Sequence, residues 1–270
     1  MTATSRAESP ALLPRERLLM AVAHQPDIEL AAAKQFGLGA EIQCFSFPAT
    51  LATDYRQPLE AMQKQVETIV GPIGCHGAFI DTCPFSPDPA IRIVAQQRYV
   101  ESMDIAAALG AQYIVFHSQY NPAIKVRQYP QVYHQENLIV WPALLEEARE
   151  RGLRVYIENM FDQTPEPMAR LAEALDTPDF RICFDIAHSE LFSPCPLEDW
   201  IAALGPFIAH VHMNDSYGEF DDHLPLGMGT LDLPRALRLL DRIAPDATYT
   251  LETGQDIPGS LAYLGISPVQ

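Results

Sequence analysis

Basic side chains are scarce in this 270-residue chain, which has 18 Lys and Arg against 35 Asp and Glu and a formal net charge of −17. A nucleic-acid backbone is bound through clustered Lys and Arg, so this balance argues against a nucleic-acid partner. A net charge this far from zero favours solubility and carries no information about fold. The remaining composition, 48% hydrophobic and 20% charged, is typical of a globular protein and argues against intrinsic disorder.

Paired cysteines and long apolar runs are also missing. The five cysteines are an odd number and none forms a C-x-x-C pair, so we expect reduced thiols instead of a disulfide framework. No run approaches the ~18 apolar residues that a membrane helix requires. Residues 1–15 lack the apolar segment of a secretory signal and are expected to form a flexible N-terminal arm. We therefore expect a cytoplasmic protein that does not insert into a membrane.

Short apolar runs alternate along the chain with longer segments that have helical spacing. Most of the short runs are apolar almost throughout, as in strands that are buried on both faces of a parallel sheet. The expected strands lie at 18–23, 40–45, 71–79, 111–117, 153–159, 180–186, 207–213 and 247–253. The expected helices lie at 27–36, 58–70, 89–109, 135–151, 165–175, 197–204 and 234–242, with a short, poorly defined segment at 257–264.

This alternation predicts an α/β protein with a parallel sheet and right-handed crossovers. Eight units in 270 residues suit a closed (β/α)8 TIM barrel, which we expect to form a single domain over residues 16–270. An open, doubly wound sheet is the alternative. No Gly-rich phosphate loop follows the first strand, and this weakens the dinucleotide-binding form of that alternative.

Polar residues lie at or near the ends of six of the expected strands. In a (β/α)8 barrel the carboxyl ends of all strands surround one mouth, so residues that are distant in sequence converge there. Each residue alone is readily explained as a core histidine or a helix cap. The set comprises His76, His117, Glu158, Asp185, His188, His212 and Glu252, together with Asp221 and His223 in the loop after the seventh strand.

The whole set points to a metal site. Buried carboxylates are rare unless they are paired or bind a metal, and several of them around one mouth would repel each other without a cation. Mixed imidazole and carboxylate ligands suit Zn²⁺, Mn²⁺, Co²⁺ or Fe²⁺, whereas ligand sets made only of oxygen suit Mg²⁺ or Ca²⁺. We therefore expect a divalent cation as cofactor, Zn, Mn, Co, Fe or Mg, with one to three ions per chain.

Several motifs in the second half of the chain resemble those of the xylose isomerase-like barrel superfamily, which includes sugar isomerases, epimerases and endonuclease IV enzymes. In chain order these motifs are VYIEN, CFDIAH, HVHMND, DDHLPLGMGTLD and LETG. They contain Asp215, Gly227 and Gly229 in addition to the polar residues named above. The resemblance extends over nearly the whole chain after the N-terminal arm.

The resemblance implies a ligand set for one catalytic metal. Carried over by motif, these ligands are Glu158, Asp185, His212 and Glu252, at the ends of strands five to eight. It also implies that His188, three residues after Asp185, contacts the substrate or a second metal.

The endonuclease IV branch of the superfamily holds three zinc ions. It adds a His on strand three, a His on strand four and a D-x-H pair. The corresponding candidates in this chain are His76, His117, Asp221 and His223. The match of His76 is the least specific of these, because the surrounding GCHGAF is short and generic.

The preferred reading is a metal-dependent isomerase or epimerase of a small sugar, sugar phosphate or related polyol or ketose. It acts through a metal-stabilised ene-diolate, and Glu158 and Glu252 remove and return the proton on the substrate carbon. His188 joins them as a catalytic candidate, and His117 and His188 are candidates for substrate contact. Lys125 and Arg127, in the loop after the fourth strand, are candidates to hold a phosphate or carboxylate of the substrate.

Two other hypotheses about the function are also compatible with the sequence. The full set of potential ligands suits an endonuclease IV-like, multi-metal phosphodiesterase or hydrolase, in which a metal cluster activates water. A metal-binding barrel without catalytic activity is the other alternative, although the retained Glu158 and Glu252 argue against it. The expected partner is a small polyhydroxylated molecule, and the sequence is also compatible with a homo-oligomer.

Overall fold

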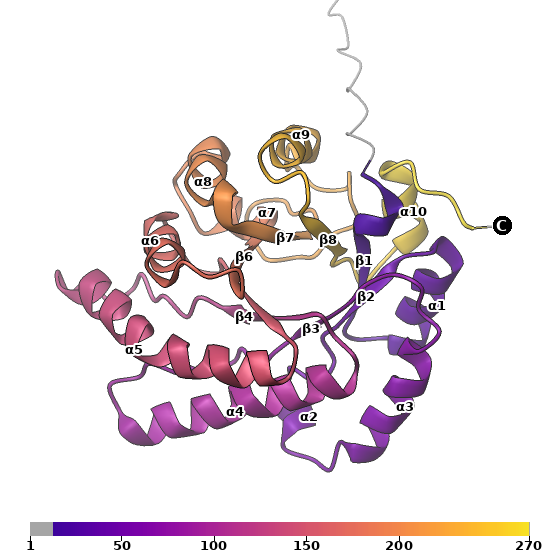
Figure 1. Ribbon diagram of the computed structural model, residues 1–270. Coiled ribbons are helices and arrows are strands. Elements are labelled where there is room, and N and C mark those ends of the chain that lie inside the picture. The colour runs from indigo at the N-terminus through magenta and orange to yellow at the C-terminus, as the bar shows by residue number, and fades with distance from the viewer. Residues whose placement is uncertain (1–12, 270) are drawn as a thin grey trace, which may run out of the picture.

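The computed structural model describes residues 13–269, and over these residues eight parallel strands close into a barrel. Each strand pairs with the next one in sequence, and β8 pairs with β1 to complete the ring (Figure 1). This confirms the predicted (β/α)8 barrel and excludes the open sheet. The strands are β1 Leu18–Val22, β2 Gly39–Ile42, β3 Ile73–His76, β4 Tyr113–His117, β5 Arg154–Glu158, β6 Phe180–Asp185, β7 Ile208–Met213 and β8 Thr248–Leu251.

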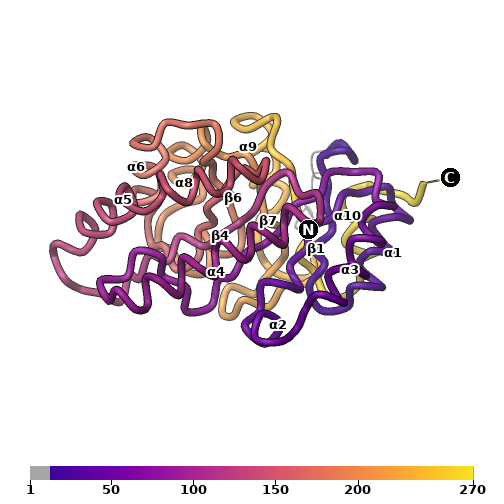
Figure 2. Tube along the Cα trace, turned by 60° about the horizontal axis from the view of Figure 1, so that its bottom comes forward, coloured from indigo at the N-terminus to yellow at the C-terminus, as the bar shows by residue number. Residues whose placement is uncertain are grey.

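Helices surround the barrel, and the C-terminal segment lies beside the first of them (Figures 1 and 2), where Val269 N donates to Gln35 O. One helix begins six residues before its predicted start, and two short ones were not predicted. The helices are α1 Pro26–Phe36, α2 Pro48–Leu51, α3 Arg56–Val66, α4 Pro89–Ala108, α5 Tyr129–Glu150, α6 Glu166–Leu175, α7 Ile186–Leu191, α8 Leu197–Leu204, α9 Leu233–Ile243 and α10 Ile257–Tyr263.

Local chemistry explains where several helices begin and end. The Asp88 side chain accepts a hydrogen bond from Ala90 N and caps α4, and the Asp232 side chain caps α9 in the same way through Arg235 N. Gly37 ends α1 with a φ of +65°, a left-handed conformation that glycine adopts readily. Among the described residues, no helix is long and apolar enough to cross a membrane.

The sequence predicts a flexible N-terminal arm over residues 1–15 and five reduced cysteines. Residues 1–12 of the expected arm lie outside the described residues, whereas Leu13 is buried and a 3-10 helix begins at Arg15. All five cysteines are within the described part of the chain and carry free thiols, as predicted.

Apolar packing lies mostly between the barrel and its helices, while the barrel interior is largely polar. The larger apolar cluster joins outward-facing strand residues to the helices, with Trp141 and Trp200 fully buried. A small second cluster contains Leu19, Tyr113 and Tyr156, whose side chains point into the barrel. This arrangement follows from the alternation of side chains along each strand.

Contacts between strands that are not neighbours identify the residues inside the barrel. Glu41 on β2 contacts His210 and His212 on β7, and Tyr113 on β4 donates to Glu41. Such contacts can form only across the interior of a closed barrel. The interior therefore carries a buried stack of polar side chains that leads to the carboxyl ends of the strands.

Gly77, just after β3, provides a test of barrel packing. A Cβ atom at this position would lie 2.1 Å from the ring of Phe116, which is itself stacked on Tyr99. We expect Gly77→Ala to lower the free energy of unfolding by about 1–3 kcal/mol, because overpacking must displace a buried ring. Urea denaturation measures this change.

Gly254→Ala is the matched control, because no atom lies within 4 Å of the added Cβ and the backbone is not left-handed. Its stability should be unchanged or slightly higher. Equal losses in the two variants would contradict the packing argument.

Candidate metal centre

The polar residues predicted from the sequence converge at the carboxyl ends of the strands, around one pocket of about 570 Å³. Asp185 and His212 are fully buried, and neither is among the residues that line the pocket. Seven of the nine predicted metal-ligand candidates line it: His76, His117, Glu158, His188, Asp221, His223 and Glu252.

Glu158, at the end of β5, is the centre of the cluster. Its Oε2 lies 3.2 Å from His76 Nε2 and 3.3 Å from His117 Nε2. Its Oε1 lies 3.2 Å from His212 Nδ1 and 3.4 Å from His188 Nδ1. One buried carboxylate thus faces four imidazoles from four other strand ends or adjoining loops.

Two buried atoms beside Glu158 lack hydrogen-bond partners. They are Asp185 Oδ2 and His212 Nδ1. His212 Nδ1 also lies 3.4 Å from Glu252 Oε1. Buried polar atoms are nearly always paired, so two unpartnered ligand atoms among carboxylates fit a divalent cation. Glu158, Asp185 and His212 can present ligand atoms within 4.8 Å of one another, a spacing at which a single cation could bind all three.

A further group of ligand atoms lies toward the mouth of the pocket. Asp221 Oδ2 lies 3.2 Å from His188 Nε2, and its Oδ1 lies 3.3 Å from His223 Nε2. His223 has a φ of +48°, an uncommon conformation for a non-glycine residue, and its Nδ1 is 2.9 Å from Glu252 O. This geometry directs the imidazole toward Asp221.

The charges in the cluster are strongly coupled. Burial alone would raise the pKa of Glu158, but the neighbouring His212 and His117 hold it well below its usual range. Burial raises the pKa of Asp185 to about 7. Burial lowers the pKa of His188, but Asp185 and the hydrogen bond to Asp221 outweigh it and raise that pKa well above the ordinary value. A divalent cation would replace protons in such a site.

Two of the predicted substrate-binding residues are not in the pocket. Lys125 and Arg127 are exposed in the loop between β4 and α5, and neither is among the residues that line the pocket. The other two, His117 and His188, do line it. The structure thus brings the imidazoles to the pocket and leaves the basic loop outside.

Asp215 and the glycines of the GMG motif build the loop after β7. Asp215 accepts hydrogen bonds from the backbone of Ser216, Gly227 and Leu231. A Cβ on Gly229 would lie 2.3 Å from Asp215 Oδ1. These residues therefore hold the loop that carries Asp221 and His223, without reaching the pocket themselves.

Sequence reasoning missed three polar residues inside the barrel: Glu41, Gln43 and His210. Glu41 lies within an apolar strand run, where a carboxylate is unusual and was a usable signal in the sequence, and the structure shows that it is fully buried. Gln43 Nε2 donates to both Glu41 Oε1 and Glu252 Oε1. His210 Nε2 lies 2.9 Å from Glu41 Oε2.

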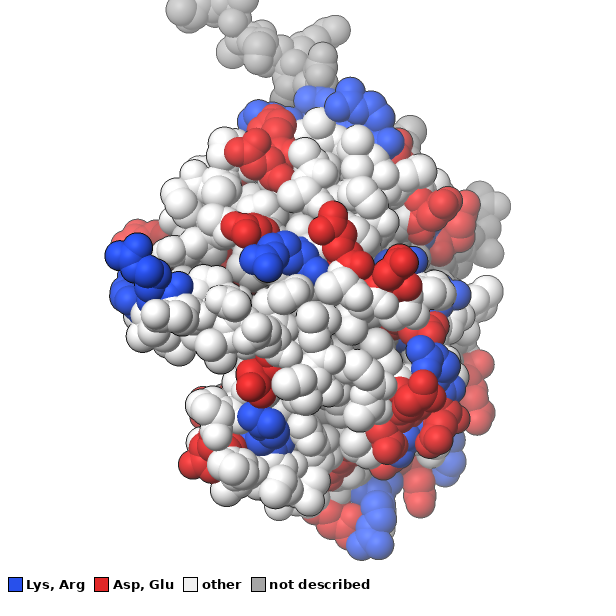
Figure 3. All heavy atoms as spheres, turned by 60° about the vertical axis from the view of Figure 1, so that its left-hand side comes forward, with Lys and Arg blue, Asp and Glu red and all other residues white. Residues whose placement is uncertain are grey.

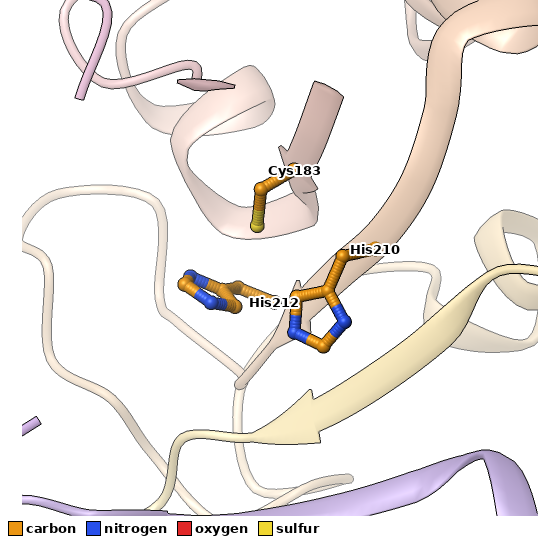
Figure 4. Close-up of side chains that lie close together, drawn as sticks. All are labelled: Cys183, His210 and His212. Atoms are coloured by element: carbon orange, nitrogen blue, oxygen red, sulfur yellow. The ribbon is translucent and has the colours of Figure 1, made fainter. Parts of the chain in front are cut away.

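Cys183, His210 and His212 also lie close together, deep in the barrel (Figure 4). Both ring nitrogens of His210 have other partners, because Nδ1 lies 2.6 Å from Thr248 Oγ1 and Nε2 lies 2.9 Å from Thr250 Oγ1. Burial raises the pKa of the Cys183 thiol well above its usual value. We therefore interpret Cys183 and His210 as polar packing below the metal centre, next to the ligand candidate His212.

Comparison with known proteins places these features in context. The sequence profile of the xylose isomerase-like TIM barrel family matches residues 30–264 of this chain. The uncharacterized protein MJ1311 of Methanocaldococcus jannaschii is 25% identical over 195 residues, which cover 70% of this chain and 64% of that protein. The chain thus matches slightly less than two thirds of the length of this relative.

Solved structures share the fold. The TTHB071 protein from Thermus thermophilus, from a crystal soaked with ZnCl2, is 29% identical with a TM-score of 0.75, covering 92% of this chain and 96% of that one. A D-tagatose 3-epimerase-like protein is 20% identical with a TM-score of 0.74, covering 91% and 93%. The IOLI protein, whose structure has a bound zinc atom, is 15% identical with a TM-score of 0.71, covering 92% and 94%.

His223 tests whether the outer group binds its own cation. We expect His223→Ala to bind one divalent cation fewer than the wild type, because Asp221 and His188 alone leave that group with too few ligands. Elemental analysis after loading with Zn²⁺ measures the number of ions. His134→Ala, which removes an imidazole outside the pocket, is the control. If His223→Ala keeps the wild-type count, the outer group contacts substrate instead of metal.

Proposed function

The chain belongs to the xylose isomerase-like TIM barrel family, and on that premise we propose that it is a divalent-metal-dependent isomerase or epimerase of a small sugar, sugar phosphate or related polyol. The main support is the placement of the four central ligand candidates, which are Glu158, Asp185, His212 and Glu252. Only Glu158 and Glu252 among them line the pocket, whereas Asp185 and His212 lie beneath it. Two carboxylates at the surface of one centre suit proton removal and proton return.

Within this class, the lining of the pocket favours a small neutral sugar or polyol over a sugar phosphate. No Lys or Arg is found among the described residues that line it. Phe47 and Phe79 pack edge to face with ring centroids 5.7 Å apart, and the Phe79 ring also packs against His117. Such rings offer an apolar wall to the C–H face of a sugar. On the face in Figure 3, Lys and Arg side chains form separate small groups instead of a continuous band.

In this proposal the metal ligands, the two glutamates and His188 have separate chemical roles. A cation bound by Glu158, Asp185, His212 and Glu252 would polarise the substrate carbonyl and lower the cost of negative charge on the adjacent carbon. The Glu158 or Glu252 carboxylate takes the proton from that carbon, and the other carboxylic acid returns one from its own side. The His188 ring is oriented by Asn159 O, which lies 2.9 Å from its Nδ1. Its Nε2, 3.2 Å from Asp221, can contact a substrate oxygen in place of Asp221.

Names of structural neighbours agree with this chemistry. They include the D-tagatose 3-epimerase-like protein and the 3-keto-D-glucoside 4-epimerase YcjR from E. coli, the latter 16% identical with a TM-score of 0.70 over 92% of this chain and 98% of that one. The likeness at this identity is one of fold, so substrate and reaction rest on the pocket itself.

Glu158→Gln and Glu252→Gln test the two carboxylates. Each change keeps the size and one acceptor oxygen but removes the basic site, so each should lower turnover about 10²-fold or more at saturating metal. The measurement is proton NMR in D₂O, on the substrate found by a screen of ketoses, ketose phosphates and phosphodiesters. Each variant should also exchange the C–H of only the epimer that faces its remaining carboxylate.

Glu219→Gln is the control, because Glu219 is an exposed carboxylate of the same type that does not line the pocket. Its turnover should match the wild type. Wild-type turnover in either active-site variant would contradict the assignment of that carboxylate as acid or base.

A second function, hydrolysis of a phosphodiester, is favoured by one specific observation. His76 and His117 form a ligand group with Glu158, and His188, Asp221 and His223 form another, on either side of the central group. Adjacent cations can activate water and neutralise a leaving phosphate oxygen.

Hydrolysis of bis(p-nitrophenyl) phosphate, measured while Zn²⁺ is added stepwise, distinguishes the two functions. A hydrolase should gain activity with the second and third cations and lose it in His223→Ala. A protein that epimerises a sugar with one cation and never cleaves the diester would exclude this second function.

A further inference from the structure

Glu41 lies at the centre of the barrel, below the candidate ligands, and is fully buried. Its Oε2 accepts hydrogen bonds from the hydroxyls of Tyr113, at 2.9 Å, and Thr250, at 3.0 Å. Its Oε1 accepts from Gln43 Nε2 at 2.9 Å and faces His212 Nε2 at 3.0 Å. These contacts come from several strands and hold the carboxylate in one orientation.

The contact with His212 determines which ring nitrogen faces the cluster. An ionised carboxylate can only accept a hydrogen bond, so His212 must carry a proton on Nε2 where it meets Glu41. The other ring nitrogen, Nδ1, points to Glu158 and Glu252 and has no hydrogen-bond partner. Metal-ligating histidines characteristically donate their second ring N–H to a carboxylate in this way.

We propose that Glu41 is a positioning residue for the metal centre: it accepts the Nε2 proton of His212 and thereby directs the Nδ1 lone pair of His212 at the cation. Through Gln43, which donates to Glu41 and to Glu252, the same carboxylate also fixes a second ligand. Glu41 is absent from the lining of the pocket and therefore acts without touching substrate. This inference rests on the metal site of the proposed function.

A competing role for Glu41 is direct ligation. Glu41, His212 and Glu252 can also present ligand atoms within 4.8 Å of one another. The oxygens of Glu41 already accept from four side chains, and this favours positioning over ligation. The two roles differ in the number of cations that a variant binds.

Glu41→Gln separates these roles, because it keeps the shape and an acceptor oxygen while removing the charge. We expect its Zn²⁺ affinity, measured by competition with a chelating dye, to fall about 10- to 100-fold with the number of bound ions unchanged. The d–d absorption of the Co²⁺-loaded variant should shift, because the electron donation of His212 changes. Thermal unfolding of the metal-free proteins reports whether the variant folds.

Tyr113→Phe is the matched control. It removes a donor to the other oxygen of Glu41 and leaves the contact between Glu41 and His212 in place. Because Gln43, Thr250 and His212 still hold the Glu41 carboxylate, the Zn²⁺ affinity and Co²⁺ spectrum of this variant should match the wild type. An equal loss in Tyr113→Phe would assign the effect to packing of the polar interior and overturn the proposal.

Three further results would overturn the positioning role. Unchanged affinity in Glu41→Gln would remove it, and loss of one bound ion would make Glu41 a ligand. Failure of the wild type to bind any divalent cation would overturn both this inference and the proposed function, whereas the first two results leave the proposed function intact.

The protonation of the His212 ring in the wild type is a second test, which does not depend on whether Glu41→Gln folds. In the Zn²⁺-loaded protein labelled with ¹⁵N-histidine, long-range ¹H–¹⁵N correlation should find His212 protonated on Nε2 and metal-bound through Nδ1. The opposite assignment of the two nitrogens would overturn the proposal.

Discussion

The site depends on one buried carboxylate that faces more imidazoles than it can neutralise. The two oxygens of Glu158 lie within 3.4 Å of nitrogens from four histidines. A buried carboxylate is stable only with compensating charge or hydrogen bonds, so every neighbour of Glu158 is constrained in its protonation. Barrel closure makes this possible, because only the pairing of β8 with β1 brings strand ends from both halves of the chain to one point.

In the proposed metal centre, protons would take the place of cations when no metal is bound. Burial lowers the pKa of His76, but Glu158 outweighs it and raises that pKa. Burial also lowers the pKa of His212, but Cys183 and the carboxylates of Glu252, Glu41 and Glu158 raise it well above its ordinary value. Asp185, in contrast, has its pKa raised to about 7 by burial, so it too tends to hold a proton. Metal binding must displace these protons, which links the affinity of the centre to pH. The polar interior below, with Glu41 at its centre, stays in place through either state.

Much of the architecture was predictable because its signals are local. Eight nearly continuous apolar runs gave all eight strands to within a few residues. Helix α5 begins at Tyr129 instead of residue 135, with Pro130 in its first turn, where no backbone N–H is needed for a helical hydrogen bond. The short helices α2 and α7 are too brief for periodicity to reveal. Residue types at the strand ends were predictable, but the role of Glu41 was not, since it depends on contacts across the barrel.

The charge of the filled site connects the number of cations to the kind of substrate. Glu158, Asp185, Glu252 and Asp221 carry four negative charges when ionised, and no Lys or Arg is found among the described residues that line the pocket. With neutral imidazoles, one divalent cation leaves an excess of negative charge, which repels phosphate and suits a neutral carbonyl or polyol. Three cations would carry more charge than these four ligand carboxylates, so the cations themselves could bind the oxygens of a phosphate without any basic side chain. In the proposed centre, isomerase and hydrolase chemistry are therefore alternatives that the same residues would support at different metal occupancies, and the number of cations bound at the outer group with His223 distinguishes them.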